Sequence, residues 1–356
     1  MKSMSTALIH VKVKARMYNF AGSLRSFSVN WKWAALTLLL CLSLAATQAR
    51  AQSLGYEGPT GIFVTPLAMT ATSPAKGIGM PFVSYHYLAG GPLAGDFSTV
   101  STTVGFAKRF EAGYTHEFHL TDGSSDSLVG VRFTPLWDSG IDIVHFKANV
   151  TPHALSKAAI FSVGGIYRFN DQIGVNINNL AAKLISADNI KPVLAEQKTD
   201  NADVYLVATK IIPQTKPIPI ILSAGIRGTN ASLWGLGGNA PGFEGKAFGS
   251  VAFVITGPAK STIILASEVA EQPQHIFSAT AKATMGSAKA ATLFDIPTSE
   301  SYDVRVVPFA KRKLNIDVSI LHAGGNIDNP LLNTLAGGHV DLNMRARAAF
   351  AISYGF

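Results

Sequence analysis

Apolar and polar residues alternate up to the last position of this 356-residue chain. In the closing stretch RARAAFAISYGF, the residues Phe350, Ile352, Tyr354 and Phe356 share one face of an extended strand, and small or polar residues occupy the other face. Chain ends usually fray because nothing holds them. The pattern therefore predicts a terminal strand that is fixed in a sheet.

The same alternation recurs along the chain, with charged residues in the middle of several predicted strands. In Leu314–Leu321 the apolar positions oppose Asn315, Asp317 and Ser319, and in YDVRVV they oppose Asp303 and Arg305. Charges on the inner face of a dry protein core are costly, but they are stable in a water-filled lumen. The pattern favours a membrane barrel over a water-soluble sandwich.

Short turns and longer connections separate these segments in alternation. The predicted short turns are 106–111, 134–140, 169–172, 212–217, 256–261 and 308–313. The predicted longer connections are 89–96, 121–127, 150–157, 180–201, 229–243, 270–301 and 323–338. We therefore predict an all-β fold: a transmembrane antiparallel up-and-down β-barrel of about fourteen strands, with about twelve as the alternative. The first strand, Ile78–Leu88, pairs with the last, Met344–Phe356, to close the wall.

The N-terminus has the pattern of a secretory signal peptide. A basic stretch precedes the short apolar run Trp33–Ala46 and an Ala-Arg-Ala site that ends at Ala51. We predict a signal peptide over 1–51, a periplasmic lead-in segment over 52–76 and an outer-membrane barrel over 77–356. The lead-in either tucks into the lumen or forms a mobile tail. Cleavage removes Cys41, the one cysteine of the chain.

Removal of the signal also changes the charge balance. The whole chain has 30 Lys and Arg against 22 Asp and Glu, and seven of the basic residues precede Gln52. The remaining chain is close to neutral, so the basic character that is typical of nucleic-acid binding disappears. We predict no nucleic-acid partner.

Charged residues of the inner face are the candidate functional residues. The predicted lumen-lining residues are Arg132, Arg168, Arg227, Arg305, Arg345, Arg347, Glu111, Glu117, Asp303 and Asp317, with Lys210 as a further candidate. They indicate either a pore for small polar solutes or a lumen filled by internal ion pairs. Phe350, Ile352, Tyr354 and Phe356 resemble the C-terminal signature that the outer-membrane barrel assembly machinery reads.

Enzymatic and metal chemistry is not predicted. His116 and His119 are three positions apart, so a strand directs them to opposite faces and they cannot share a metal ion easily. A hydrolase with His119 or His322 near the rim is the weak alternative. We expect no cofactor and no catalytic residue.

Several stretches resemble a bacterial family that is catalogued as a domain of unknown function. They are Asp203–Lys210, Ile226–Gly238 and Asp303–Ile327. The opening TGIFVTP (Thr60–Pro66) and the closing strand resemble barrels associated with exopolysaccharide export. The resemblance implies an outer-membrane barrel and assigns no site residue.

These observations predict an outer-membrane barrel of a Gram-negative-type bacterium. Its expected partners are outer-membrane lipid, the barrel assembly machinery, and small polar solutes or envelope polysaccharide as cargo. The alternatives are a structural barrel with a filled lumen and an exported soluble or surface-bound β protein that binds a ligand.

Overall fold

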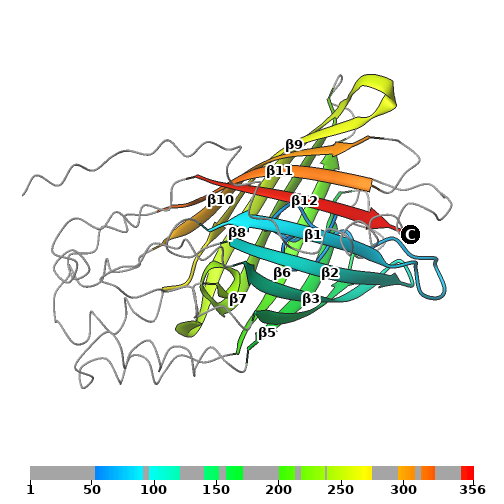
Figure 1. The fold of residues 1–356 in the computed structure, drawn as a ribbon. Helices are drawn as coiled ribbons and strands as arrows, with labels where there is room; N and C mark the ends of the chain where they lie inside the picture. Colours follow the sequence, from blue (N-terminus) through cyan, green and yellow to red (C-terminus); the bar gives the residue numbers. More distant parts are fainter. Residues whose placement is uncertain are drawn as a thin grey trace, which may run out of the picture. The chain divides into compact units, whose positions relative to one another are not determined.

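The computed structural model describes residues 53–90, 96–120, 140–151, 158–170, 200–212, 218–236, 239–274, 296–308, 314–324 and 346–356. Within these ranges the chain forms strands and two short 3₁₀ turns (Figure 1). The strands are β1 (Phe82–Ala89), β2 (Asp96–Phe106), β3 (Phe110–Leu120), β4 (Ile141–Asn149), β5 (Ile160–Phe169), β6 (Asn201–Ile212), β7 (Ile220–Ala231), β8 (Asn239–Thr256), β9 (Thr262–Glu271), β10 (Thr298–Val307), β11 (Leu314–Ala323) and β12 (Arg347–Gly355). The 3₁₀ turns are η3 (Ser232–Gly235) and η4 (Pro258–Lys260). None of these elements is a helix with the length and apolar character that a membrane span needs.

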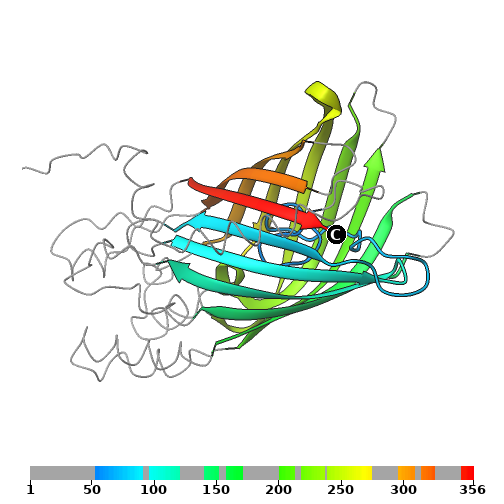
Figure 2. The same ribbon diagram turned by 45° about the vertical axis from the view of Figure 1, so that its right-hand side comes forward.

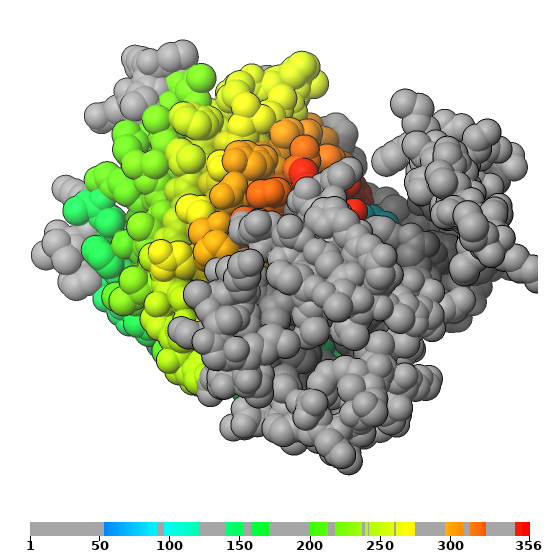
Figure 3. All heavy atoms as spheres, turned by 90° about the vertical axis from the view of Figure 1, so that its left-hand side faces the viewer, coloured from blue at the N-terminus to red at the C-terminus, as the bar shows by residue number. Residues whose placement is uncertain are grey.

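The strands form one closed antiparallel barrel in which each strand pairs with its neighbours in the sequence. β1 and β12 close it, with Phe82 opposite Gly355 and Leu88 opposite Ala349 (Figure 2). Figure 3 shows the strands from β6 to β11 side by side in chain order. The predicted seam between the first and last strands is confirmed. The chain end is held further because the N–H of Phe356 donates to the carbonyl of Pro81 at 3.1 Å.

The barrel has twelve strands in the described residues, so the alternative strand number is confirmed and fourteen is wrong. The two additional strands were expected next to the predicted turns at 134–140 and 169–172, mostly outside the described residues. β3 pairs directly with β4, and β5 pairs directly with β6. No further strand therefore lies between these pairs in the wall.

The direction of β4 corrects the assignment of two connections. Phe110 lies opposite Ala148, and Glu117 lies opposite Ile141. The connection 150–159 therefore lies at the barrel end that carries the tight 107–109 turn, which we call the turn end. The opposite end, where β3 ends and β4 begins, we call the loop end. Strict alternation had implied that the longer connection 150–157 and the short turn 134–140 belong to the opposite ends from those at which β4 ends and begins.

The wall is polar inside and apolar outside. Asp317 and Ser319 are buried on the inner face of β11, whereas Val318 and Ile320 on its outer face are 58 % and 50 % exposed. β6 and β7 repeat the pattern, and their outward Val204 and Ile226 are each 63 % exposed. Water-soluble proteins place these residue types the other way round.

Candidate functional site: a luminal segment held by buried charges

Residues 53–73 lie inside the barrel, and we call them the luminal segment (Figure 2). Leu54, Tyr56 and Phe63 are each 1 % exposed. The segment folds on itself, because the N–H of Tyr56 donates to the carbonyl of Phe63 at 2.7 Å and the N–H of Leu67 donates to that of Thr60 at 3.1 Å. About eight strands make a barrel whose own side chains fill the interior. The wider twelve-stranded wall has room for this additional segment.

Both ends of the luminal segment lie at the turn end of the barrel. The Ser53 hydroxyl lies 2.8 Å from that of Ser353, which is near the end of β12. At the other end, the Ser73 hydroxyl accepts a hydrogen bond of 2.9 Å from the N–H of Lys108 in the β2–β3 turn. The segment therefore enters and leaves by the same opening.

Glu268 of β9 anchors the tip of the segment. Its carboxylate accepts hydrogen bonds from the N–H groups of Phe63 at 2.9 Å, Val64 at 2.9 Å and Thr65 at 2.6 Å. The hydroxyl of Ser301 on β10 donates to the same carboxylate at 2.5 Å. Hydrogen bonds to an ionised acceptor are about twice as strong as neutral ones. One wall carboxylate thus fixes three successive residues of the segment.

A buried ion pair holds the middle of the segment. Lys147 of β4 lies 2.8 Å from Glu111 of β3, and both side chains are fully buried. Glu111 accepts from the N–H groups of Thr60 at 3.0 Å and Ala71 at 2.7 Å. Lys147 donates to the carbonyls of Thr60 and Leu67 at 2.9 Å each. Both charges of the pair therefore bind backbone groups of the segment.

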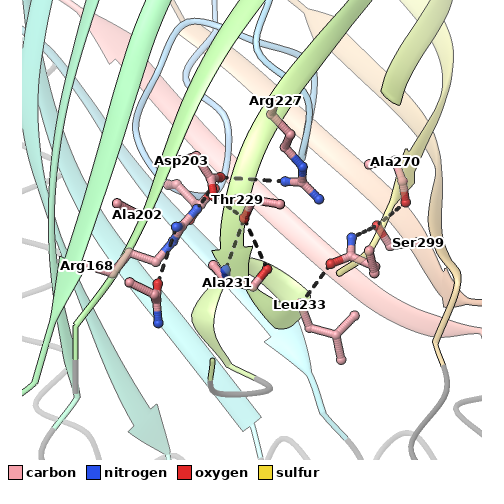
Figure 4. Close-up of polar contacts among 12 residues, drawn as sticks. Arg168, Ala202, Asp203, Arg227, Thr229, Ala231, Leu233, Ala270 and Ser299 are labelled. Atoms are coloured by element: carbon pink, nitrogen blue, oxygen red, sulfur yellow. Dashed lines mark hydrogen bonds and ion pairs between the residues drawn. The ribbon is translucent and has the colours of Figure 1, made fainter. Parts of the chain in front are cut away.

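Arg168 of β5 is the centre of a larger network (Figure 4). Its guanidinium donates to Glu57 of the luminal segment and, at 2.8 Å, to Asp203 of β6. Arg227 of β7 lies 3.6 Å from Asp203, and the hydroxyl of Thr229 donates to the same carboxylate. Two cations and two carboxylates thus share one buried site that joins three strands to the segment.

Arg305 of β10 supplies the contacts on the opposite wall. It donates to Asp317 of β11 at 2.6 Å and to the carbonyls of Gly61 at 3.4 Å and Ile62 at 3.2 Å. Cationic side chains bind backbone carbonyls, and anionic side chains bind backbone N–H groups. The wall charges therefore satisfy polar groups of a segment that has no regular secondary structure.

An apolar layer covers the segment toward the loop end. Trp234 of η3 is 6 % exposed, and its ring lies 6.4 Å from that of Tyr56. Leu233 and Trp234 have φ values of 46° and 58°, which bulky residues rarely adopt. The N–H of Leu233 donates to the side chain of Gln272 at 2.9 Å (Figure 4). Burial, and then the nearby Glu117 carboxyl, raise the pKa of Tyr56 well above its usual value, so its phenol stays protonated.

The structure places most of the predicted lumen residues on the inner face. Those that are buried there are Glu111, Glu117, Arg168, Arg227, Asp303, Arg305 and Asp317. Arg347 is partly buried at the start of β12, and Arg132 and Arg345 lie outside the described residues. The prediction that Lys210 faces the lumen is wrong. Lys210 is exposed, and its neighbour Thr209 is the residue that is buried on the inner face. Whether the inner residues conduct a solute stays a prediction.

Four residues of the site were not among the predictions: Glu57, Lys147, Asp203 and Glu268. Asp203 and Glu268 follow the same alternation as the predicted residues, so the period of two contained a signal for them. Glu57 had no such signal, because the luminal segment lacks a period.

The histidines and the terminal aromatics lie as follows. His116 bonds Asp142 at 2.8 Å toward the outside, and the ring of His119 lies 4.9 Å from that of Phe97 inside. Within the described ranges no group of three or more His, Cys, Asp or Glu side chains is arranged to hold a metal ion.

Of the proposed assembly signal, Phe350 is exposed, and Ile352, Tyr354 and Phe356 are half-buried.

Comparisons with known proteins give neither a family nor a curated relative. No family model matches the chain, and no curated protein matches it. The sequence resemblance to an uncharacterised family therefore stays a prediction.

Solved structures that are similar to the chain include other barrels. The NanC porin is 7 % identical with a TM-score of 0.40 over 78 % of this chain and 98 % of that one. LpxR from Salmonella typhimurium is 9 % identical with a TM-score of 0.40 over 77 % and 100 % of the two chains. Wzi, an outer-membrane protein involved in group 1 capsule assembly in Escherichia coli, is 11 % identical with a TM-score of 0.26 over 73 % and 52 %. Likeness at this level carries no argument about activity.

Proposed function

We propose that this protein is an outer-membrane channel for small polar solutes that is closed by its own luminal segment. The observation that carries the proposal is the chemistry of the contact between segment and wall. Glu111, Lys147, Glu268 and Arg305 bind backbone groups of the segment, and water can replace such partners when the segment leaves. A departure would therefore leave a polar, hydrated passage behind.

The membrane location is part of the proposal. The outer face is apolar, and the closed strand order pairs each wall strand with a neighbour on both sides, so that no sheet edge is exposed, as lipid requires. Envelope polysaccharide is the alternative cargo, and it rests on the sequence resemblance alone. A permanently filled structural barrel is the second candidate function, favoured by the apolar layer around Trp234.

A lysine on the outer face tests the membrane location. We expect Ile226→Lys to destabilise the lipid-inserted barrel by about 2–4 kcal/mol, because a cation at the bilayer midplane loses its hydration. The measurement is urea unfolding in lipid vesicles. Ile78→Lys is the matched control, since Ile78 precedes β1 and is 73 % exposed. Equal stability of the two variants would mean that water contacts the outer face.

Weakening the anchor of the segment tests the channel. Glu268→Gln removes the negative charge that holds Phe63, Val64 and Thr65. Hydrogen bonds to charged groups contribute about 1.5–3 kcal/mol, so openings in planar bilayers should become roughly tenfold to hundredfold more frequent. Glu271→Gln on the exposed end of the same strand is the control and should behave as the parent protein. If the Glu268→Gln variant folds but shows no channel openings, the result would favour the permanently filled structural barrel as the function.

A further inference from the structure

The outer face of the wall carries a group of polar side chains on β2, β3 and β4. Nδ1 of His116 lies 2.8 Å from Oδ1 of Asp142, and these two side chains are 42 % and 34 % exposed. The hydroxyl of Tyr114 donates to the same oxygen of Asp142. Thr102 lies opposite Tyr114 and is exposed on the same face. We call these four residues the outer polar cluster.

The outer polar cluster lies within the apolar part of the wall. On the outer face of β3, Phe110 and Ala112 precede the cluster, and Phe118 and Leu120 follow it. β3 has 11 residues, which is the length of a tilted strand that crosses a bilayer. The cluster is therefore near the middle of the lipid-facing band rather than at the level of the headgroups.

Other parts of the wall are apolar in the corresponding positions. The exposed residues in the middle of these strands are Val204 and Leu206 on β6, Leu222 and Ile226 on β7, and Val318 and Ile320 on β11. Ionisable side chains in the spanning part of a membrane protein are costly against hydrocarbon, and they almost always face protein or water instead. We therefore expect the outer polar cluster to contact protein rather than lipid.

The cluster has both an acceptor and a donor that no described residue uses. Asp142 receives both of its hydrogen bonds at Oδ1, so Oδ2 has a free place. The hydroxyl of Thr102 has no hydrogen-bond partner in the described part of the chain. Val100 and Val144 are exposed on the same strands and supply apolar contact area around the polar centre. A surface that carries a donor, an acceptor and an apolar margin is complementary to a copy of itself.

We propose that the outer polar cluster is the centre of an interface between two copies of this protein, which a twofold axis along the membrane normal relates. Such an axis keeps each residue at its own depth, so the cluster of one copy meets the same cluster of the other. Thr102 of each copy then donates to Asp142 of the other, and this bond occurs twice. The inference rests on the proposed membrane location and is independent of whether the lumen conducts.

Cross-linking in native outer membranes tests the interface with the full chain. Cys41 is the one cysteine of the chain, so a Cys41→Ser background leaves a single introduced thiol in each copy. With Val144→Cys we expect a membrane-permeant bismaleimide to produce a species of twice the mass. Val204→Cys is the matched control, because Val204 is exposed on the outer face of β6, away from the cluster, and it should stay monomeric.

A second variant removes the acceptor. Asp142→Leu, combined with Val144→Cys, keeps the outer face apolar, so the barrel should fold and show heat-modifiable mobility on gels. Loss of the two symmetric hydrogen bonds should weaken dimerisation about tenfold, measured as the cross-linked fraction when the protein is diluted in lipid vesicles. Glu300→Leu removes a carboxylate from the outer face of β10 and should dimerise like the parent.

Three results would overturn the proposal. They are cross-linking of Val144→Cys that does not exceed that of Val204→Cys, a cross-linked product that contains a different protein, and a folded Asp142→Leu variant that dimerises like the parent. Ile226→Lys tests the membrane location separately. A monomeric protein that Ile226→Lys nevertheless destabilises would overturn the interface and leave the proposed location intact.

Discussion

A barrel in which a Gly/Ser linker of equal length replaces residues 54–72 is expected to conduct ions continuously in planar bilayers, where the parent protein is mostly closed. The replacement removes the side chains that fold and bury the segment, so its backbone groups are no longer held where Glu111, Lys147 and Glu268 bind them. Side chains fill barrels of about eight strands, whereas barrels of 16–18 strands leave an aqueous channel. The wall lies between these sizes, and its freed charges would be hydrated rather than paired with the segment.

The control replaces the exposed residues 74–77 with the same type of linker and should stay closed, because these residues lie outside the luminal segment. Heat-modifiable mobility on gels establishes that both variants are folded. A folded variant without the segment that nevertheless passes no current would mean that the wall side chains close the lumen themselves. The filled structural barrel would then replace the channel as the proposed function.

Arg168→Met is expected to destabilise the folded barrel by about 3–5 kcal/mol, because it leaves the carboxylates of Glu57 and Asp203 with less counter-charge inside the barrel. Urea unfolding of the detergent-solubilised protein measures the difference. Lys246→Met is the matched control. Lys246 lies 2.9 Å from Glu244, but these side chains are 22 % and 32 % exposed, so the loss should stay below about 1 kcal/mol.

A double variant separates lost charge balance from lost packing. In Arg168→Met with Glu57→Gln, Asp203 keeps Arg227 as its counter-charge, and most of the lost stability should return. Equal stabilities of Arg168→Met and Lys246→Met would contradict the account, because the buried network would then contribute no more than a surface pair.

The wall of the barrel was predictable because each strand repeats one simple rule. A period of two placed Asp317 inside and Val318 outside, and the same rule at the C-terminus predicted that β12 closes against β1. The strand number was less predictable. Alternation over a few residues does not show whether a segment pairs into the wall, so it added two wall strands next to 134–140 and 169–172 that the closed strand order does not contain.

The candidate site was predictable only on the wall side. Alternation identified Arg168 and Glu111 as inward-facing, but it contains no information about what they bind. The luminal segment is rich in Gly and Pro and has no period, so the sequence left open whether it enters the barrel. Its position depends on contacts with residues far along the chain, such as Glu268 and Arg305, which no local pattern encodes.

The shared opening at which the luminal segment enters and leaves has a consequence for assembly. Residues 53–73 do not pass from one end of the barrel to the other, so β1 and β12 can join before the segment docks. Assembly would then pass through an intermediate in which the barrel is closed but its lumen is still open. The lifetime of this permeable intermediate depends on how quickly the luminal segment binds the wall. Cells that accumulate this species should become sensitive to bulky toxic compounds before any defect in barrel insertion is detectable.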